Sequence, residues 1–208
     1  MAVEINPKDT TRAYAFEMWM KAPNPMVTLF RTFDVTRLVK ISKRKKLKFN
    51  MLMCYCIGKA AAGINEFYTL PVADKLMKYD KIAVNVIVKN KSSGVSSCDI
   101  NYTEDIEKFN ADYLNYTVNT AETAEDRDLS ADCMVIGTSA LIETEIDGAV
   151  GMYSGIFNNP FIIWGRYRSK FFRHKLPVSF QFHHTQMDGE QAGRFIENLQ
   201  TAINTITL

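Results

Sequence analysis

The segment from Pro177 to Gly189 constrains this chain more than any other, because an alternating strand pattern ends there in two adjacent histidines. Successive side chains of a strand face opposite sides, so Phe180 and Phe182 predict one apolar face. His184 continues that row, whereas His183 belongs to the opposite face. An imidazole in an apolar row loses solvation of its charged form, which favours the neutral base. The pattern therefore indicates either a hydrogen-bonded core histidine or a general base.

Strands and helices mix along the chain without strict alternation. Helices are predicted around Arg12 and over Thr36–Lys43, Phe49–Ile64, Thr103–Tyr113 or a little beyond, and Glu190 to about Ile206. Strands are predicted over Met26–Val35, Lys81–Val88, Cys133–Ile142, Gly151–Phe157, Ile162–Arg168 and Leu176–His184. This order predicts an α/β fold in which helices pack on one side of a mixed, largely antiparallel sheet.

Length and composition agree with a compact enzyme. The chain has 208 residues, 47% of them hydrophobic, and no linker or repeat divides it, so we expect a single domain over 1–208. A net charge of +2 predicts no polyanion-binding surface, and nucleic acid is not an expected partner. The N-terminus lacks a signal-peptide pattern and no apolar run is long enough to span a bilayer. These observations predict a cytoplasmic protein without a membrane partner.

Cysteine and histidine usage predicts no metal site. The four cysteines contain no C-x-x-C pair and are expected as reduced thiols: Cys54, Cys56, Cys98 and Cys133. The chain has only three histidines, and the adjacent His183 and His184 would point apart on a strand rather than converge on an ion.

The residues around the histidines resemble those of a known family. The pattern H-H-x-x-x-D-G, the segment Asn159–Ile163 and Tyr167 have the spacing found in trimeric-type chloramphenicol acetyltransferases. Arg12, followed by Phe-Glu, is similar to the family's opening arginine, and Thr138–Leu141 is similar to its central serine segment. The resemblance covers nearly the whole chain. Dihydrolipoamide acyltransferases carry a related histidine motif, but they add lipoyl domains and Pro/Ala-rich linkers that this sequence lacks.

The resemblance implies a two-layer α/β sandwich that forms a homotrimer, with the active site between subunits. It implies that His184 is the general base, which deprotonates the acceptor hydroxyl for direct attack on acetyl-CoA. Ser139 would donate a hydrogen bond to the tetrahedral oxyanion. Arg12 and Asp188 would form a buried ion pair that supports His184. Without the resemblance, Ser139 would be interpreted as an ordinary strand hydroxyl and Arg12 as a solvated surface residue.

For the co-substrate, the resemblance implies contacts from three residues. Lys48 corresponds to a family lysine at the nucleotide end of CoA, and Arg166 and Tyr167 correspond to a Lys-Tyr pair beside the pantetheine. The rest of the basic run over Lys40–Lys48 is expected to be solvated. The sequence contains no Gly-rich phosphate loop that would compete with this assignment.

The acceptor site departs from the family pattern. Met18 and Trp19 stand at positions of pocket residues, but Ile163 replaces a threonine thought to hold a water against the transition state. Gly137 and Glu143 also depart from the pattern. Chloramphenicol is therefore the leading acceptor, with antibiotic resistance as the associated role. Two alternatives stay open: an acetyltransferase for another alcohol, amine or thiol, and a non-catalytic trimeric binding protein.

Overall fold

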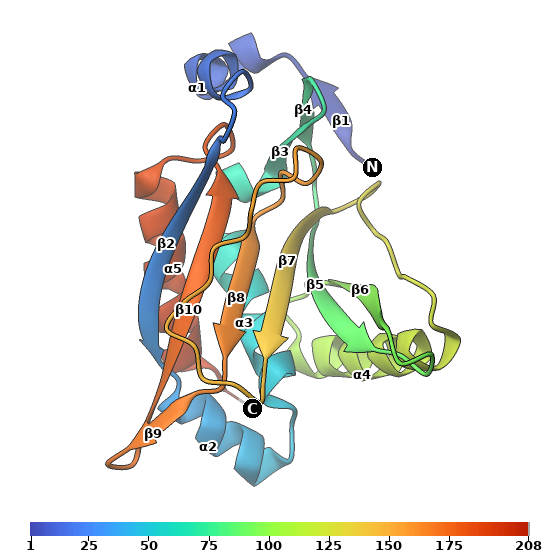
Figure 1. Ribbon diagram of the computed structural model, residues 1–208, viewed down its shortest axis with the longest axis vertical. Helices are drawn as coiled ribbons and strands as arrows, with labels where there is room; N and C mark the ends of the chain where they lie inside the picture. The colour runs from blue at the N-terminus through green and yellow to red at the C-terminus, as the bar shows by residue number, and fades with distance from the viewer. Residues whose placement is uncertain (208) are drawn as a thin grey trace.

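The computed structural model, which describes residues 1–207, is built on a seven-stranded sheet with helices behind it (Figure 1). The strands of this sheet are β2 (Met26–Asp34), β5 (Ile82–Lys89), β6 (Val95–Asn101), β7 (Met134–Leu141), β8 (Phe161–Gly165), β9 (Arg168–Lys170) and β10 (Arg173–His183). The helices are α1 (Ala13–Trp19), α2 (Thr36–Lys45), α3 (Phe49–Ala62), α4 (Ile106–Thr123) and α5 (Gly189–Thr205), with 3-10 turns at Pro7–Asp9 and Asn65–Tyr68. A small second sheet contains β1 (Val3–Ile5), β3 (Thr69–Val72) and β4 (Lys75–Lys78).

The large sheet is mixed and mostly antiparallel, which confirms the predicted fold class. Its strand order is β2-β10-β8-β7-β5-β6, and β9 pairs with β10 outside this path. The β5–β7 and β7–β8 pairs are parallel, and the other pairs are antiparallel. The helices α3 and α5 cover one face, so the two-layer arrangement follows from one apolar face per layer.

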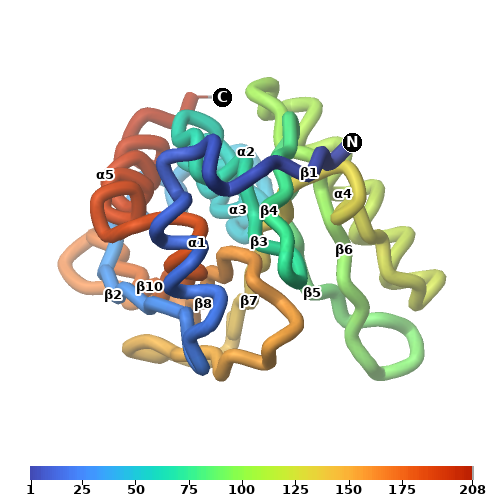
Figure 2. The backbone as a smooth tube through the Cα atoms, turned by 90° about the horizontal axis from the view of Figure 1, so that it is seen from above, coloured from blue at the N-terminus to red at the C-terminus, as the bar shows by residue number. Residues whose placement is uncertain are grey.

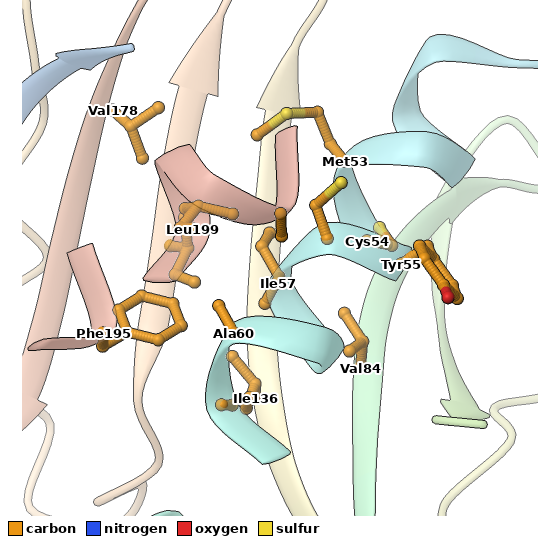
Figure 3. Packing of buried hydrophobic residues seen from close by; sticks show 14 of the residues in the cluster. Met53, Cys54, Tyr55, Ile57, Ala60, Val84, Ile136, Val178, Phe195 and Leu199 are labelled. Carbon is orange, nitrogen blue, oxygen red and sulfur yellow. The ribbon is translucent and has the colours of Figure 1, made fainter. Parts of the chain in front are cut away.

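The core lies between α3, α5 and the helix-facing side of β10. Phe180 of β10 packs against Phe195 of α5, with ring centroids 4.5 Å apart and planes tilted by 44°. Figure 3 shows Val178, Phe195 and Leu199 packed together with Ile57 of α3. Because α3 is apolar on nearly all sides, it is buried as the central helix of this layer. Full burial of each large side chain contributes about 1.5–3 kcal/mol.

The loop over residues 142–160 covers the other face of β10. Ala149 donates a backbone hydrogen bond to Ser179 Oγ (2.8 Å), and Gln181 Nε2 donates to the Gly151 carbonyl (2.9 Å). The strand predicted over Gly151–Phe157 is wrong, because this segment is irregular. β7 and β8 pair directly with each other, so no free strand edge lies between them for the loop to join.

Two other element predictions need correction. The helix predicted over Thr103–Tyr113 starts at Ile106, after the Asp105 cap, and continues to Thr123. It continues because buried Thr117 and Thr120 extend its packed face although they are not apolar. The strands β1, β3, β4, β6 and β9 were not predicted, four of them being only three or four residues long. Within residues 1–207 no helix has the length and apolarity needed to cross a membrane.

Candidate active site

His184 lies directly after the last residue of β10, where α1 crosses the end of the sheet (Figure 2). Its backbone N–H donates to the Pro25 carbonyl (2.9 Å), which fixes the chain at this point. The imidazole stacks flat on Trp19, with ring centroids 4.3 Å apart and planes 6° apart. The Phe182 ring makes a T-shaped contact with the imidazole, with ring centroids 6.5 Å apart. The aromatic rings therefore hold the plane of the imidazole.

The two edges of the His184 ring have different surroundings. Nδ1 is buried and lies 3.1 Å from Oδ1 of Asp188, within ion-pair distance but not aligned as a hydrogen bond. The side chain as a whole is 26% exposed. The exposed part of the ring is therefore away from Nδ1. A ring held in this way can exchange a proton with a bound molecule through Nε2.

Arg12 is 7% exposed and fixes the turn that follows β10. Its guanidinium binds both carboxylate oxygens of Asp188, at 2.5 and 2.9 Å. It also donates to the backbone carbonyls of His184 (2.7 Å) and Thr185 (3.0 Å). These hydrogen bonds and the positive charge of Arg12 hold the pKa of Asp188 below its usual range. The structure thus contains an ion pair between these two residues, and it is tied to the main chain of the candidate base.

Asp188 has a second role at the start of α5. It forms a capping box with Gln191, in which each side chain accepts a hydrogen bond from the other residue's backbone. The helix start and the strand end are therefore fixed to the same carboxylate.

His183 carries the burial that the strand pattern predicts for His184. It is 1% exposed, and its Nδ1 accepts a hydrogen bond from the Thr185 backbone N–H (3.1 Å). Burial lowers the pKa of His183 to about 4. His184 follows the last residue of the strand, and its ring lies beside Phe182 of the apolar row, but its side chain is only partly buried. The partly exposed histidine is the one available for chemistry.

Ser139 lies on β7, level with Ile163 of β8 and Ser179 of β10. Residues in such a cross-strand row share one face, here the face covered by the 142–160 loop. His184 is five positions beyond Ser179, which is about 16 Å along the strand. Ser139 is also separated from β10 by the width of β8. The structure therefore does not bring Ser139 and His184 together within one chain.

Gly137 makes room for the side chain of Phe161. The two residues are neighbours across β7 and β8, and a Cβ at position 137 would overlap the Phe161 ring. The Phe161 ring therefore occupies the space that a side chain at position 137 would fill. Gly137 and Ser139 lie on the same face of β7.

The three expected CoA contacts line one cavity. A hollow of about 440 Å³ is bordered by Lys48 at the start of α3 and by Arg166 and Tyr167 after β8. Sequence reasoning missed the remaining lining residues, which are Phe49, Asn50, Tyr113, Ile142, Trp164 and Gly165. Trp164 is fully buried apart from its place in the cavity lining, and its indole N–H is buried without a partner within residues 1–207. Only the aromatic content of these segments could have indicated them from the sequence.

The remaining predicted positions lie apart from this cavity. Met18 is 44% exposed on α1, next to the Trp19 that stacks on His184. Ile163 lies beside Ser139, and Glu143 is exposed in the loop after β7. No group of three or more His, Cys, Asp or Glu side chains within residues 1–207 could hold a metal ion. All four cysteines are free and buried.

The sequence is similar to those of known proteins along nearly its whole length. The family model described as chloramphenicol acetyltransferase matches residues 2–200. Chloramphenicol acetyltransferase 3 of Escherichia coli is 27% identical over 97% of both chains. The chloramphenicol acetyltransferase of Clostridium perfringens is 25% identical over 94% of this chain and 92% of its own.

Solved structures show the same fold. A chloramphenicol acetyltransferase matches with a TM-score of 0.84 and 18% identity, over 98% of this chain and 100% of its own. A catalytic core of the 2-oxoacid dehydrogenase complex from Thermoplasma acidophilum matches with a TM-score of 0.67 and 17% identity, over 98% and 97%.

Proposed function

Because the chain belongs to the chloramphenicol acetyltransferase family, we propose that it transfers an acetyl group from acetyl-CoA directly to an acceptor hydroxyl, with chloramphenicol as the leading acceptor. The family model spans nearly the whole chain, so the protein is a CoA-dependent acyltransferase, and we treat 1–208 as one catalytic domain. The proposal rests on the placement of His184. Its imidazole stacks on Trp19, and its Nδ1 edge lies next to Asp188, which is paired with Arg12. A cytoplasmic location stays a prediction.

His184 supplies the base that this transfer needs. A hydroxyl is a poor nucleophile until a base removes its proton as it attacks. With its Nδ1 edge towards the Asp188 carboxylate, the imidazole keeps its proton on that side and accepts the hydroxyl proton at Nε2. The acceptor oxygen bonds to the thioester carbon, the carbon–sulfur bond breaks, and the imidazolium returns the proton to the CoA thiolate. No acyl-enzyme is required.

Asp188 stabilises the imidazolium that His184 becomes when it has accepted the hydroxyl proton. Its carboxylate is ionised because Arg12 lowers its pKa, and it lies 3.1 Å from Nδ1 of His184. A nearby negative charge stabilises an imidazolium. Asp188 and Arg12 are therefore positioning residues rather than proton carriers.

We propose that Ser139 reaches the reaction from a neighbouring subunit of a homotrimer. The register separates Ser139 from His184 of the same chain, as described above, so a shared site needs two chains. Apolar side chains on and near the 142–160 loop favour such an assembly: Ile142, Val150, Met152, Ile156 and Phe157 are 60–96% exposed. In that arrangement the Ser139 hydroxyl donates to the oxyanion, a contact worth about 3–4 kcal/mol in comparable enzymes.

The cavity beside Lys48 suits a CoA thioester. Lys48 and Arg166 are exposed cations at its rim, which suits the phosphates of CoA. Phe49 and Tyr167 have ring centroids 5.3 Å apart and offer an aromatic wall beside which the pantetheine arm can lie.

The acceptor is the less constrained part of the proposal. Ile163 is apolar at a position beside Ser139, so any contact to the transition state at this point lacks a hydroxyl donor. This change motivates the second candidate, transfer to another alcohol, amine or thiol.

Release of free CoA thiol from acetyl-CoA, measured with and without chloramphenicol, tests the function. We expect release that depends on chloramphenicol and saturates with both substrates. Saturable acetyl-CoA binding with no chloramphenicol-dependent release would reject chloramphenicol and direct the test to a panel of alcohols, amines and thiols. No turnover with any of them would support the non-catalytic binding protein.

A further inference from the structure

The hairpin between β9 and β10 ends in two phenylalanines that the candidate active site does not use. Phe171 and Phe172 are 84% and 97% exposed. They form the two-residue loop between Lys170 and Arg173, which pair across the hairpin. Both phenylalanines have positive φ, 47° and 62°. Turns of this geometry favour Asn and Gly, and bulky residues there are strained, so folding does not explain this pair.

The acidic residues next to the hairpin are paired with cations. Asp34 pairs with Arg173 and Lys175, and Glu145 and Asp147 pair with Arg168 of β9. Lys170 Nζ lies 5.6 Å from the centroid of the Phe171 ring. Lys170 forms no ion pair within residues 1–207, so its charge is available at the tip.

The helix α2 adds a second group of cations next to the hairpin. It packs against the start of β10, where the His174 backbone N–H donates to Thr36 Oγ1 (2.9 Å). Besides Arg37, which donates to the Ile206 carbonyl, five exposed basic residues line this helix and its C-cap: Lys40, Lys43, Arg44, Lys45 and Lys46. Within residues 1–207 none of the five has an acidic partner at ion-pair distance. The apolar tip is thus bordered by unpaired positive charge.

An apolar tip beside unpaired cations is complementary to an anionic lipid surface. Aromatic side chains enter the interfacial region, and Lys and Arg contact the headgroups. A second copy of this chain fits less well, because the same cations would face one another across the contact. We propose that the β9–β10 hairpin docks on an anionic phospholipid membrane, with Phe171 and Phe172 inserted and the α2 cations on the headgroups.

This surface contact needs no membrane-spanning segment, so it revises the expectation that the protein has no membrane partner. The tip lies at the opposite end of β10 from His184 (Figure 1), about 33 Å along the strand. Docking would therefore leave the catalytic end of the sheet open.

Sedimentation with lipid vesicles tests the proposal. One set of vesicles is phosphatidylcholine alone, and the other contains about 30% phosphatidylserine, as in an anionic leaflet. We expect the native protein to sediment with the anionic vesicles only, and less so at high salt. The double variant Phe171→Asn/Phe172→Gly suits the turn and should stay folded, with at least about tenfold weaker vesicle binding.

Charge-reversal variants show whether vesicle binding depends on the cations of α2 or only on the net charge of the protein. Lys43→Glu/Arg44→Glu should weaken binding by at least about tenfold, at roughly fivefold for each charge. Lys78→Glu/Lys81→Glu makes the same charge change at the other end of the sheet and should bind nearly as the native protein does. Circular dichroism and CoA-thiol release confirm that each variant is folded.

Equal sedimentation of the Asn-Gly variant and the native protein would overturn the proposal, as would equal binding to neutral and anionic vesicles. Failure of the native protein to bind either vesicle, together with a changed oligomeric state in the Asn-Gly variant, would assign the tip to a subunit contact instead.

Discussion

At the scale of single residues, Arg12 gives the candidate base its fixed position. Its guanidinium binds the Asp188 carboxylate and the carbonyls of His184 and Thr185 from a buried site. Asp188 is about half exposed, so the pair is not fully desolvated. Arg12 is the sole hydrogen-bond donor to the His184 and Thr185 carbonyls within residues 1–207.

We predict that Arg12→Met lowers the free energy of unfolding by about 2–4 kcal/mol, because it removes donors from a carboxylate and two carbonyls. Urea unfolding measures the change. The matched control is Arg194→Met, which removes an exposed pair with Glu190 and should cost less than about 1 kcal/mol. Equal losses in the two variants would show that the Arg12 site is not specially stabilising.

His183 should make the fold sensitive to mild acid. Its pKa is about 4 in the folded chain, against an ordinary value of 6.5. As pH falls through this window, the unfolded chain takes up a proton that the folded chain refuses, so the free energy of unfolding decreases. The expected loss between pH 6.5 and pH 4 is about 2–3 kcal/mol.

The variant His183→Asn keeps an acceptor for the Thr185 N–H and cannot titrate. Its stability, measured by urea unfolding across the same pH range, should therefore change less than that of the native protein. Parallel curves would reject His183 as the source of the acid sensitivity. Asp188, whose pKa is lowered, acts below about pH 4, where its protonation removes stability.

At the scale of elements, β7 and β8 are matched to each other at Gly137 and Phe161. The ring occupies the space that a side chain at position 137 would need. Gly137→Asn should therefore destabilise the fold by about 1–3 kcal/mol through overpacking. The double variant Gly137→Asn/Phe161→Val should recover most of that loss, measured as a coupling energy in a double-mutant cycle. Additive losses would mean that the two positions do not compete for space.

Most long elements were predictable from the sequence, with β6 as an exception, and most of the short strands were not. In a long strand such as β10, polar and apolar residues alternate often enough to predict a strand. The strands β1, β3 and β4 have only three or four residues each, which is too few for such a pattern. Gly151–Phe157 looks like a strand because it is apolar, but its side chains are largely exposed. His184 was identified by its motif rather than by full burial, since it follows the end of β10 and its side chain is 26% exposed.

At the scale of the whole molecule, one chain holds the parts of the proposed site in separate places. His184 lies beyond the end of β10, whereas Ser139 faces the exposed apolar loop from the middle of the sheet. Lys48 is far in sequence from the adjacent Arg166 and Tyr167, and it meets them only in the folded chain. Their meeting could be expected from the family resemblance but not from spacing alone.

Subunit mixing tests whether His184 and Ser139 act from different chains. The variants His184→Gln and Ser139→Ala should each lose most activity. Unfolding them together and refolding the mixture should restore up to about a quarter of native activity, because a random trimer contains sites with both native residues. The same mixture without refolding is the control. No recovery from correctly assembled mixed trimers would contradict a site between subunits.

The most direct test of the account is the turnover number of His184→Gln for chloramphenicol-dependent CoA-thiol release, at saturating substrates. Glutamine keeps the size and polarity of the side chain but cannot act as a base. We predict a loss of about 10²–10⁴ in kcat, with unchanged folding and little change in acetyl-CoA affinity. A folded variant that retains turnover within about threefold of the native protein would contradict the assignment of His184 as the general base.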